Sequence, residues 1–232
     1  MNELNEPTAI HWHGLEIESY YDGVPGWGGT PGHITPAIAP GSSFVAYLTP
    51  PRAGTFIYHT HWHNVQQLRG GMYGALLVLE PGQEFNPATD KVFVLGRNGP
   101  NEMHDPLVLN GSPQPGLRVL VVGQTYRFRL INITPHDEAL AILTAGSALD
   151  LEGHTAKWRA IAKDGADLPA PQATVRDAAQ LIGPGETYDF EFVAKEPGLY
   201  RLRFSSFHFS EVTQYILVDT SGGPMSVYAT KP

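Results

Sequence analysis

Thr125-Tyr-Arg-Phe-Arg-Leu-Ile-Asn-Ile133 is the segment that indicates the fold class most clearly. Tyr126, Phe128 and Leu130 alternate with polar or charged residues, so one face of the segment is apolar and the other is largely charged. Successive side chains of a β-strand point to opposite faces, and this period of two predicts a strand with one face in a core. The segment 187–193 alternates in the same way, with aromatic residues set against two acids.

Turn-forming residues extend this prediction to the whole chain. The 232 residues include 25 glycines and 20 prolines, which separate short segments of alternating character. This punctuation is typical of an antiparallel, all-β protein with many turns. Cysteine is absent, which excludes disulfides, cysteine-ligated zinc, iron–sulfur clusters and thiolate-ligated copper.

A turn-strand-turn-strand unit occurs twice, at a constant offset of 144 residues. Its two copies are Pro40-Gly-Ser-Ser-Phe44 with Gly54-Thr-Phe56, and Pro184-Gly-Glu-Thr-Tyr188 with Gly198-Leu-Tyr200. A repeated unit of this kind predicts two β-sandwich domains of Greek-key type, at residues 1–85 and 86–232.

The repeat also predicts that Asn132 corresponds to Asn2. Residues between the linker and Asn132 have no counterpart in the first copy, so the first domain is expected to be truncated at its N-terminus. Strands are predicted in the first copy at Ser43–Leu48, Thr55–His61 and Tyr73–Leu79. In the second copy they are predicted at Lys91–Leu95, Arg118–Val122, Thr125–Ile133, Lys157–Lys163, Thr187–Val193, Leu199–Phe204 and Gln214–Val218.

Half of the ten histidines lie in two short stretches, Ile10-His-Trp-His-Gly14 and Phe56-Ile-Tyr-His-Thr-His-Trp-His63. Histidine is the commonest metal ligand in proteins, and alternate residues of a strand share one face. Each stretch is therefore expected to present its imidazoles together: His11 and His13 from the first, and His59, His61 and His63 from the second. The pattern predicts a metal site on a β-sheet.

Paired histidines two residues apart are not specific to one metal. Cupin, carbonic-anhydrase-like and metallohydrolase sites use the same spacing on a strand. The metallohydrolase pattern requires an aspartate just before the third histidine, and Trp62 stands at that place. A zinc hydrolase is therefore the weakest of these alternatives.

His11-Trp-His-Gly14 followed by Tyr58-His-Thr-His61 resembles the first two copper motifs of the multicopper oxidases, the family of laccases, ferroxidases and bilirubin oxidases. Four further stretches are similar to bacterial laccase-like members: Asp22-Gly-Val-Pro-Gly26, Gly71-Met-Tyr-Gly-Ala-Leu76, Leu109-Asn-Gly111 and Trp158-Arg-Ala-Ile-Ala-Lys-Asp-Gly-Ala-Asp-Leu-Pro169. The resemblance covers domains 1 and 2 of a three-domain enzyme and implies cupredoxin-like domains.

The resemblance also implies a ligand set and a reaction. His11 would ligate the type 2 copper, and His13, His59 and His61 would serve the type 3 pair of a trinuclear cluster. Asp22 resembles a family acid near the type 2 copper; an ordinary turn aspartate is the alternative. In this family a type 1 copper takes electrons from a reducing substrate, and dioxygen becomes water at the trinuclear cluster.

The family's other two motifs, a second HxHG and an HCH, which would lie in a third domain, are absent from this sequence. Four trinuclear ligands and every type 1 copper ligand are thus lacking, including the cysteine. We therefore expect a copper-binding fragment of a laccase-like oxidase that is inactive alone. The alternatives are a stand-alone copper-binding β-module and a subunit completed by another chain or by a third cupredoxin domain.

The charge balance and hydropathy limit the other partners. The net charge is −8 and the 15 lysines and arginines are scattered, which argues against nucleic acid and anionic membranes. No apolar run reaches the ~20 residues of a membrane span, and no signal peptide is recognisable. A periplasmic or secreted location is expected only from the family resemblance.

Overall fold

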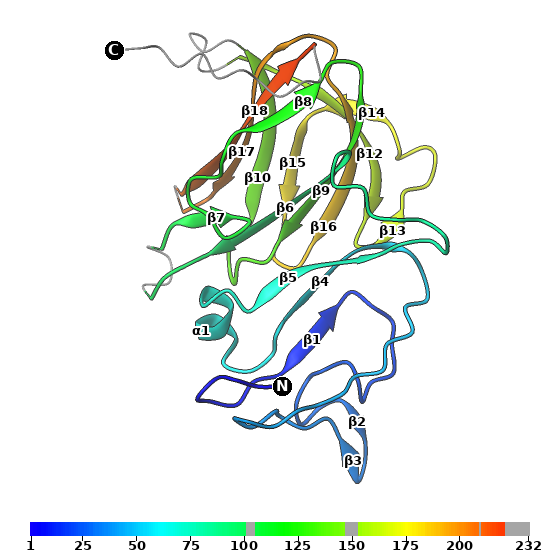
Figure 1. Cartoon of the computed structure of the whole chain (residues 1–232), viewed down its shortest axis with the longest axis vertical. Coiled ribbons are helices and arrows are strands. Elements are labelled where there is room, and N and C mark those ends of the chain that lie inside the picture. The colour runs from blue at the N-terminus through cyan, green and yellow to red at the C-terminus, as the bar shows by residue number, and fades with distance from the viewer. Residues whose placement is uncertain (101–104, 147–152, 209, 221–232) are drawn as a thin grey trace.

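The computed structural model describes residues 1–100, 105–146, 153–208 and 210–220 (Figure 1). Strands dominate the described part of the chain, as the sequence predicts, and one short helix, α1 (Asn64–Arg69), follows β4. The described part contains no helix that is long and apolar enough to cross a membrane. The strands are β1 (Ile10–His13), β2 (Gly29–Thr30), β3 (His33–Ile34), β4 (Gly54–Thr60), β5 (Tyr73–Val78), β6 (Asp90–Arg97), β7 (Leu107–Leu109), β8 (Arg118–Val121), β9 (Thr125–Asn132), β10 (Ala139–Gly146), β11 (His154–Thr155), β12 (Lys157–Lys163), β13 (Ala166–Asp167), β14 (Val175–Asp177), β15 (Ala179–Ile182), β16 (Thr187–Val193), β17 (Gly198–Ser206) and β18 (Glu211–Asp219).

Residues from β6 onward form a sandwich of two sheets, drawn in green to red in Figure 1. One sheet has the order β11-β10-β17-β18-β8, with β15 also paired to β10. The other has the order β13-β12-β16-β9-β6-β7, with β14 also paired to β12. The apolar faces predicted for 125–133 and 187–193 meet the opposite sheet in one core, which includes Phe128, Phe190, Trp158, Leu202 and Phe204.

The first part of the chain forms a three-stranded sheet, β1-β4-β5, drawn in blue to cyan below the sandwich (Figure 1). It packs on the sandwich through a small apolar cluster that joins β4, α1, β6 and β9. That cluster consists of Ile57, Leu68, Val94, Ile131 and Ile133. This small cluster, separate from the main core of the sandwich, therefore holds the three-stranded sheet against it.

Asn2 ties the N-terminal residues to the turn at positions 38–42. Its side-chain amide donates to the carbonyl oxygen of Ile38 at 2.8 Å. Its backbone N–H donates to Ser42 O at 2.8 Å, and its own carbonyl accepts from Gly41 N at 2.9 Å. These three bonds fix Asn2 against a turn whose glycine has a positive φ of 72°.

Asn132, at the end of β9, makes the same three bonds, and its partners lie 144 positions after the partners of Asn2. Its amide donates to Ile182 O at 2.9 Å, its N–H donates to Glu186 O at 3.1 Å, and its carbonyl accepts from Gly185 N at 2.8 Å. The predicted correspondence between Asn2 and Asn132 is therefore confirmed. The same pattern of three hydrogen bonds therefore occurs in both copies of the repeat.

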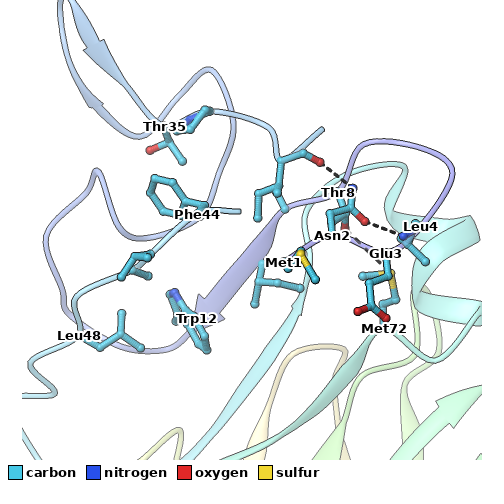
Figure 2. A pocket seen from close by; sticks show the side chains of 17 residues that line it. Met1, Asn2, Glu3, Leu4, Thr8, Trp12, Thr35, Phe44, Leu48 and Met72 are labelled. Carbon is cyan, nitrogen blue, oxygen red and sulfur yellow. Dashed lines mark hydrogen bonds between the residues drawn. The ribbon is translucent and has the colours of Figure 1, made fainter. Parts of the chain in front are cut away.

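The prediction of a strand at Ser43–Leu48 is wrong. The structure assigns no strand pairing to these residues; Phe44 and Leu48 instead line a groove of about 680 Å³ opposite Trp12 (Figure 2). In the second copy the equivalent strand, β16, is hydrogen-bonded on both sides, by β9 and β12. A strand needs a neighbour for its backbone groups, and an alternating sequence alone does not supply one.

Candidate metal centre

β1 and β4 bring the two histidine motifs together because they pair antiparallel. In their register His11 lies opposite His59, and His13 lies opposite Ile57. Directly opposed residues of an antiparallel pair have Cβ atoms roughly 4.5–5.5 Å apart, so the side chains of the two motifs are neighbours. The ladder continues past β4, where His61 N donates to Ala9 O at 3.0 Å.

His11 lies at the centre of four imidazoles. Its ring centroid is 5.5 Å from that of His13, 5.3 Å from that of His59 and 5.4 Å from that of His61. One ring nitrogen from each of His11, His13 and His59 lies within 4.8 Å of the other two. The structure thus brings together the four histidines that the family resemblance names as ligands.

Backbone carbonyl oxygens orient two of these rings. His11 Nδ1 lies 2.8 Å from Asp22 O, and His59 Nδ1 lies 2.7 Å from Thr60 O. A carbonyl oxygen only accepts, so each Nδ1 carries the proton and donates, and each Nε2 keeps its lone pair. A histidine that binds a metal through one ring nitrogen usually donates a hydrogen bond from the other, as His11 and His59 do here.

Burial keeps the cluster neutral. Desolvation lowers the pKa of His59 to about 4 and also lowers the pKa values of His13 and His61. Electrostatic repulsion from the neighbouring His11 adds to the shift in each case. At neutral pH these three imidazoles are uncharged, which is the form in which an imidazole binds a metal ion.

Asp22 lies beside His11, where the sequence predicts an acid. Besides the contact of its carbonyl, its carboxylate Oδ1 is 3.3 Å from His11 Nδ1. The loop reaches this position because Gly23, with a φ of +82°, packs directly on β1. A Cβ at this position would lie 1.7 Å from the carbonyl oxygen of Ile10, so no other residue allows the same approach.

The prediction that His63 shares a face with His59 and His61 is wrong. β4 ends at Thr60, and His63 begins α1 with a left-handed φ of 45°. Its side chain is 62% exposed and its Nδ1 lies 3.4 Å from a carboxylate oxygen of Glu6. His63 therefore lies outside the cluster, because the chain leaves the sheet before reaching it.

Two contributors to the cluster carry no signal in the sequence. The carbonyl of Thr60 holds His59, and any residue type could supply it. Gly185, in the second copy of the repeat, lies against the ring of His13 in a cleft of about 280 Å³. The repeat predicts a turn at Gly185 but says nothing of its place beside a histidine 172 positions earlier.

Comparison with known proteins points to one family for the part of the chain that carries the cluster. Residues 1–83, which contain all four histidines and Asp22, match the family model described as multicopper oxidase. This part of the chain therefore matches the multicopper oxidase family. Laccase-1 of Cryptococcus neoformans is 36% identical over 92 residues, and copper resistance protein A of Escherichia coli is 36% identical over 77 residues. The matched segments cover 38% and 33% of this chain but only 14% and 11% of those proteins.

Solved multicopper oxidase structures match almost the whole described fold. The blue copper oxidase of Nitrosomonas europaea superposes with a TM-score of 0.70 at 25% identity, covering 94% of this chain and 71% of that chain. A multicopper oxidase of Pseudomonas thermotolerans gives a TM-score of 0.71 at 24% identity, covering 97% of this chain and 54% of that one. The predicted all-β, cupredoxin-like fold is confirmed.

Proposed function

We propose that His11, His13, His59 and His61 bind copper as half of a trinuclear oxidase cluster. The observation that carries the proposal is the convergence of four imidazoles, two of them with Nδ1 bound to a backbone carbonyl. When bound, copper would supply one-electron redox chemistry and a place where dioxygen can be reduced. This chain would contribute one ligand-bearing face of the cluster.

The donor set fits copper. Imidazole nitrogens suit this metal, and the absence of cysteine leaves no competing thiolate. His13 Nδ1 and His59 Nε2 are 3.4 Å apart, and metal–imidazole bonds are about 2.0–2.1 Å long, so one ion can reach both nitrogens. The low pKa of His59 removes the competition from protons at neutral pH.

The ligand roles follow the family resemblance, and the contacts support them. His13 and His59, whose nitrogens face each other, would serve the type 3 pair together with His61. His11, at the centre of the group and fixed by Asp22 O, would serve the type 2 copper. Asp22 would act through its carboxylate Oδ1, which lies within 3.3 Å of His11 Nδ1 and can hold a proton there.

This chain lacks ligands that the rest of the parent reaction would need. A type 1 copper requires a thiolate, and the chain contains no cysteine. We infer that residues 1–85 form the copper-binding domain and residues 86–232 a second cupredoxin-like domain without copper ligands. Oxidation of a reducing substrate with dioxygen would need ligands from a third domain or from another chain.

Copper titration followed by visible spectroscopy and oxygen-consumption measurements tests the proposal. The chain should bind copper, show no intense blue absorption and consume no oxygen with a phenolic donor. A His59→Ala, His61→Ala double variant should lose the binding. His154→Ala, at an exposed position in β11, serves as the control and should bind as the unchanged chain does.

Failure of the unchanged chain to bind copper would contradict the proposal. Oxygen consumption that depends on the two histidines would instead favour completion of the cluster by a second chain. Blue absorption would be inconsistent with a chain that has no thiolate.

A further inference from the structure

Among its described residues the sandwich supplies no histidine to the cluster, but one of its turns lies against His13. Pro184 and Gly185 precede β16 and line the same cleft as His13. A Cβ built on Gly185 would lie 2.9 Å from Nε2 of His13 and 3.0 Å from Cε1. Favourable contacts between non-bonded carbon atoms lie near 3.5–4.0 Å, so a methyl group at this position would push the ring away.

Gly185 faces the Nε2–Cε1 edge of the His13 ring, and Cε1 is bonded to Nδ1, the nitrogen that faces the cluster. Nδ1 of His13 points toward Nε2 of His59, 3.4 Å away. The imidazole ring is rigid, so a shift forced on Nε2 is passed to Nδ1. Metal sites tolerate bond-length deviations of only about 0.2 Å, and the shift needed to relieve the contact exceeds that value.

We propose that Gly185 is a positioning residue for His13. Its lack of a side chain lets the turn of the second repeat copy close against the ring while Nδ1 keeps its direction toward His59. This inference rests on the proposed copper function. It assigns to the part of the chain without ligands a direct role in the metal site.

The repeat provides a matched control, Gly41. Gly41 occupies the same place in the first copy, with a φ of +72° against +82° for Gly185. Its N–H donates to Asn2 O, as that of Gly185 donates to Asn132 O. A Cβ at Gly41 would meet nothing within 4 Å. Alanine at either position therefore carries the same backbone cost, and only Gly185→Ala adds a contact with an imidazole.

The first experiment measures copper affinity of the full chain by titration with Cu²⁺. Changes in groups that orient metal ligands lower affinity about 10- to 100-fold, so Gly185→Ala should weaken binding at least about tenfold. Gly41→Ala should bind within about threefold of the unchanged chain. In a His13→Ala background, Gly185→Ala should cause no further loss, because its effect passes through the missing ring.

The second experiment is thermal unfolding without copper, which tests the contact separately from the function. Gly185→Ala should lower Tm more in the unchanged chain than in the His13→Ala background, where the methyl group has room. If Gly185→Ala folds only in the His13→Ala background, that result also supports the contact.

Four outcomes would overturn the inference. These are unchanged copper affinity in Gly185→Ala, an equal loss in Gly41→Ala, an equal further loss in the His13→Ala background, and equal Tm shifts in both backgrounds. If the unchanged chain binds no Cu²⁺ while the Tm shifts differ, the contact stands and the proposed function is what fails, together with the role assigned to Gly185 in it.

Discussion

Nδ1 of His13 and Nε2 of His59 face each other at 3.4 Å across two paired strands. His59 cannot supply a proton to this contact from Nε2, because its proton is on Nδ1, which donates to Thr60 O. The contact therefore joins two nitrogens that a single proton or a single cation can bridge. A neutral His13 can carry its own ring proton on Nδ1 and donate it to His59 Nε2. A metal ion bound to both nitrogens would take the place of that proton.

Alanine at either end of this contact should weaken copper binding. We expect His13→Ala and His59→Ala each to lower Cu²⁺ affinity at least about tenfold, since each removes a ligand from the same ion. His63→Ala is the control, because His63 is the residue before α1 and its ring lies beside Glu6, outside the cluster. Calorimetric titration measures all three. Equal losses in His63→Ala would mean that copper binds at the surface instead.

Stability of the copper-free chain should fall as the pH falls from about 6.5 to 4. The pKa of His59 is about 4 in the folded chain and about 6.5 when exposed, so the unfolded state binds more protons within this window. Protonation therefore favours unfolding, by about 2 kcal/mol at pH 5 relative to pH 7. Above pH 6.5 the contribution is complete and constant.

The measurement is the free energy of unfolding by denaturant at a series of pH values, with a chelator present. His59→Asn, which cannot titrate, should show a smaller slope between pH 4 and 6.5. An unchanged slope would assign the pH dependence to groups other than His59.

The sequence predicts strands best where one face alone meets a core. β12 and β16 have the predicted bounds because buried apolar side chains alternate with mostly charged ones along them. β10 (Ala139–Gly146) was not predicted, because Leu140 and Ile142 on its outer face are as apolar as the buried Ala141 and Leu143. Because neither face of β10 is polar, its sequence shows no alternation of apolar and polar residues.

For the candidate site too, the sequence predicts some of the residues and not others. Spacing on strands predicts His11, His13 and His59, which lie on paired strands, and also His61, which directly follows β4 and still bonds to Ala9 O. The same rule fails for His63, since nothing in the alternation marks where β4 ends. The carbonyl of Thr60 and the backbone of Gly185 act without a distinctive side chain, so only the folded arrangement reveals them.

The junction between the three-stranded sheet and the sandwich should depend on the hydroxyl group of Thr55. This buried hydroxyl donates to Asp189 Oδ2 at 2.9 Å and accepts from Arg129 Nη1 at 2.8 Å. Thr55→Val keeps the shape but leaves both charged groups short of a partner, which should cost about 1–3 kcal/mol. Thr125→Val, at an exposed position of β9, should change the free energy of unfolding by less than about 0.5 kcal/mol. If denaturant unfolding showed equal effects for the two variants, the hydrogen bonds of the Thr55 hydroxyl would not contribute to stability.

Substitution of Gly23, in the loop that holds His11, should destabilise the chain more than substitution of Gly26 in the same loop. Alanine in place of Gly23 must adopt a left-handed φ of +82° and place its Cβ 1.7 Å from the carbonyl oxygen of Ile10. Gly26, in the same loop, has a φ of +79° and nothing within 4 Å of a Cβ. The left-handed conformation alone costs an alanine about 1–2 kcal/mol, so Gly26→Ala measures that cost by itself.

Gly23→Ala should therefore lower the free energy of unfolding by clearly more than Gly26→Ala does, since the loop must also move away from β1. That movement carries Asp22 O away from His11 Nδ1, the contact that fixes the ring at 2.8 Å. We expect Cu²⁺ affinity to fall about tenfold in Gly23→Ala and to stay within about threefold in Gly26→Ala. Denaturant unfolding and copper titration of the two variants provide the comparison. A Gly23→Ala chain that is less stable but binds copper with unchanged affinity would show that His11 keeps its orientation without the Asp22 carbonyl.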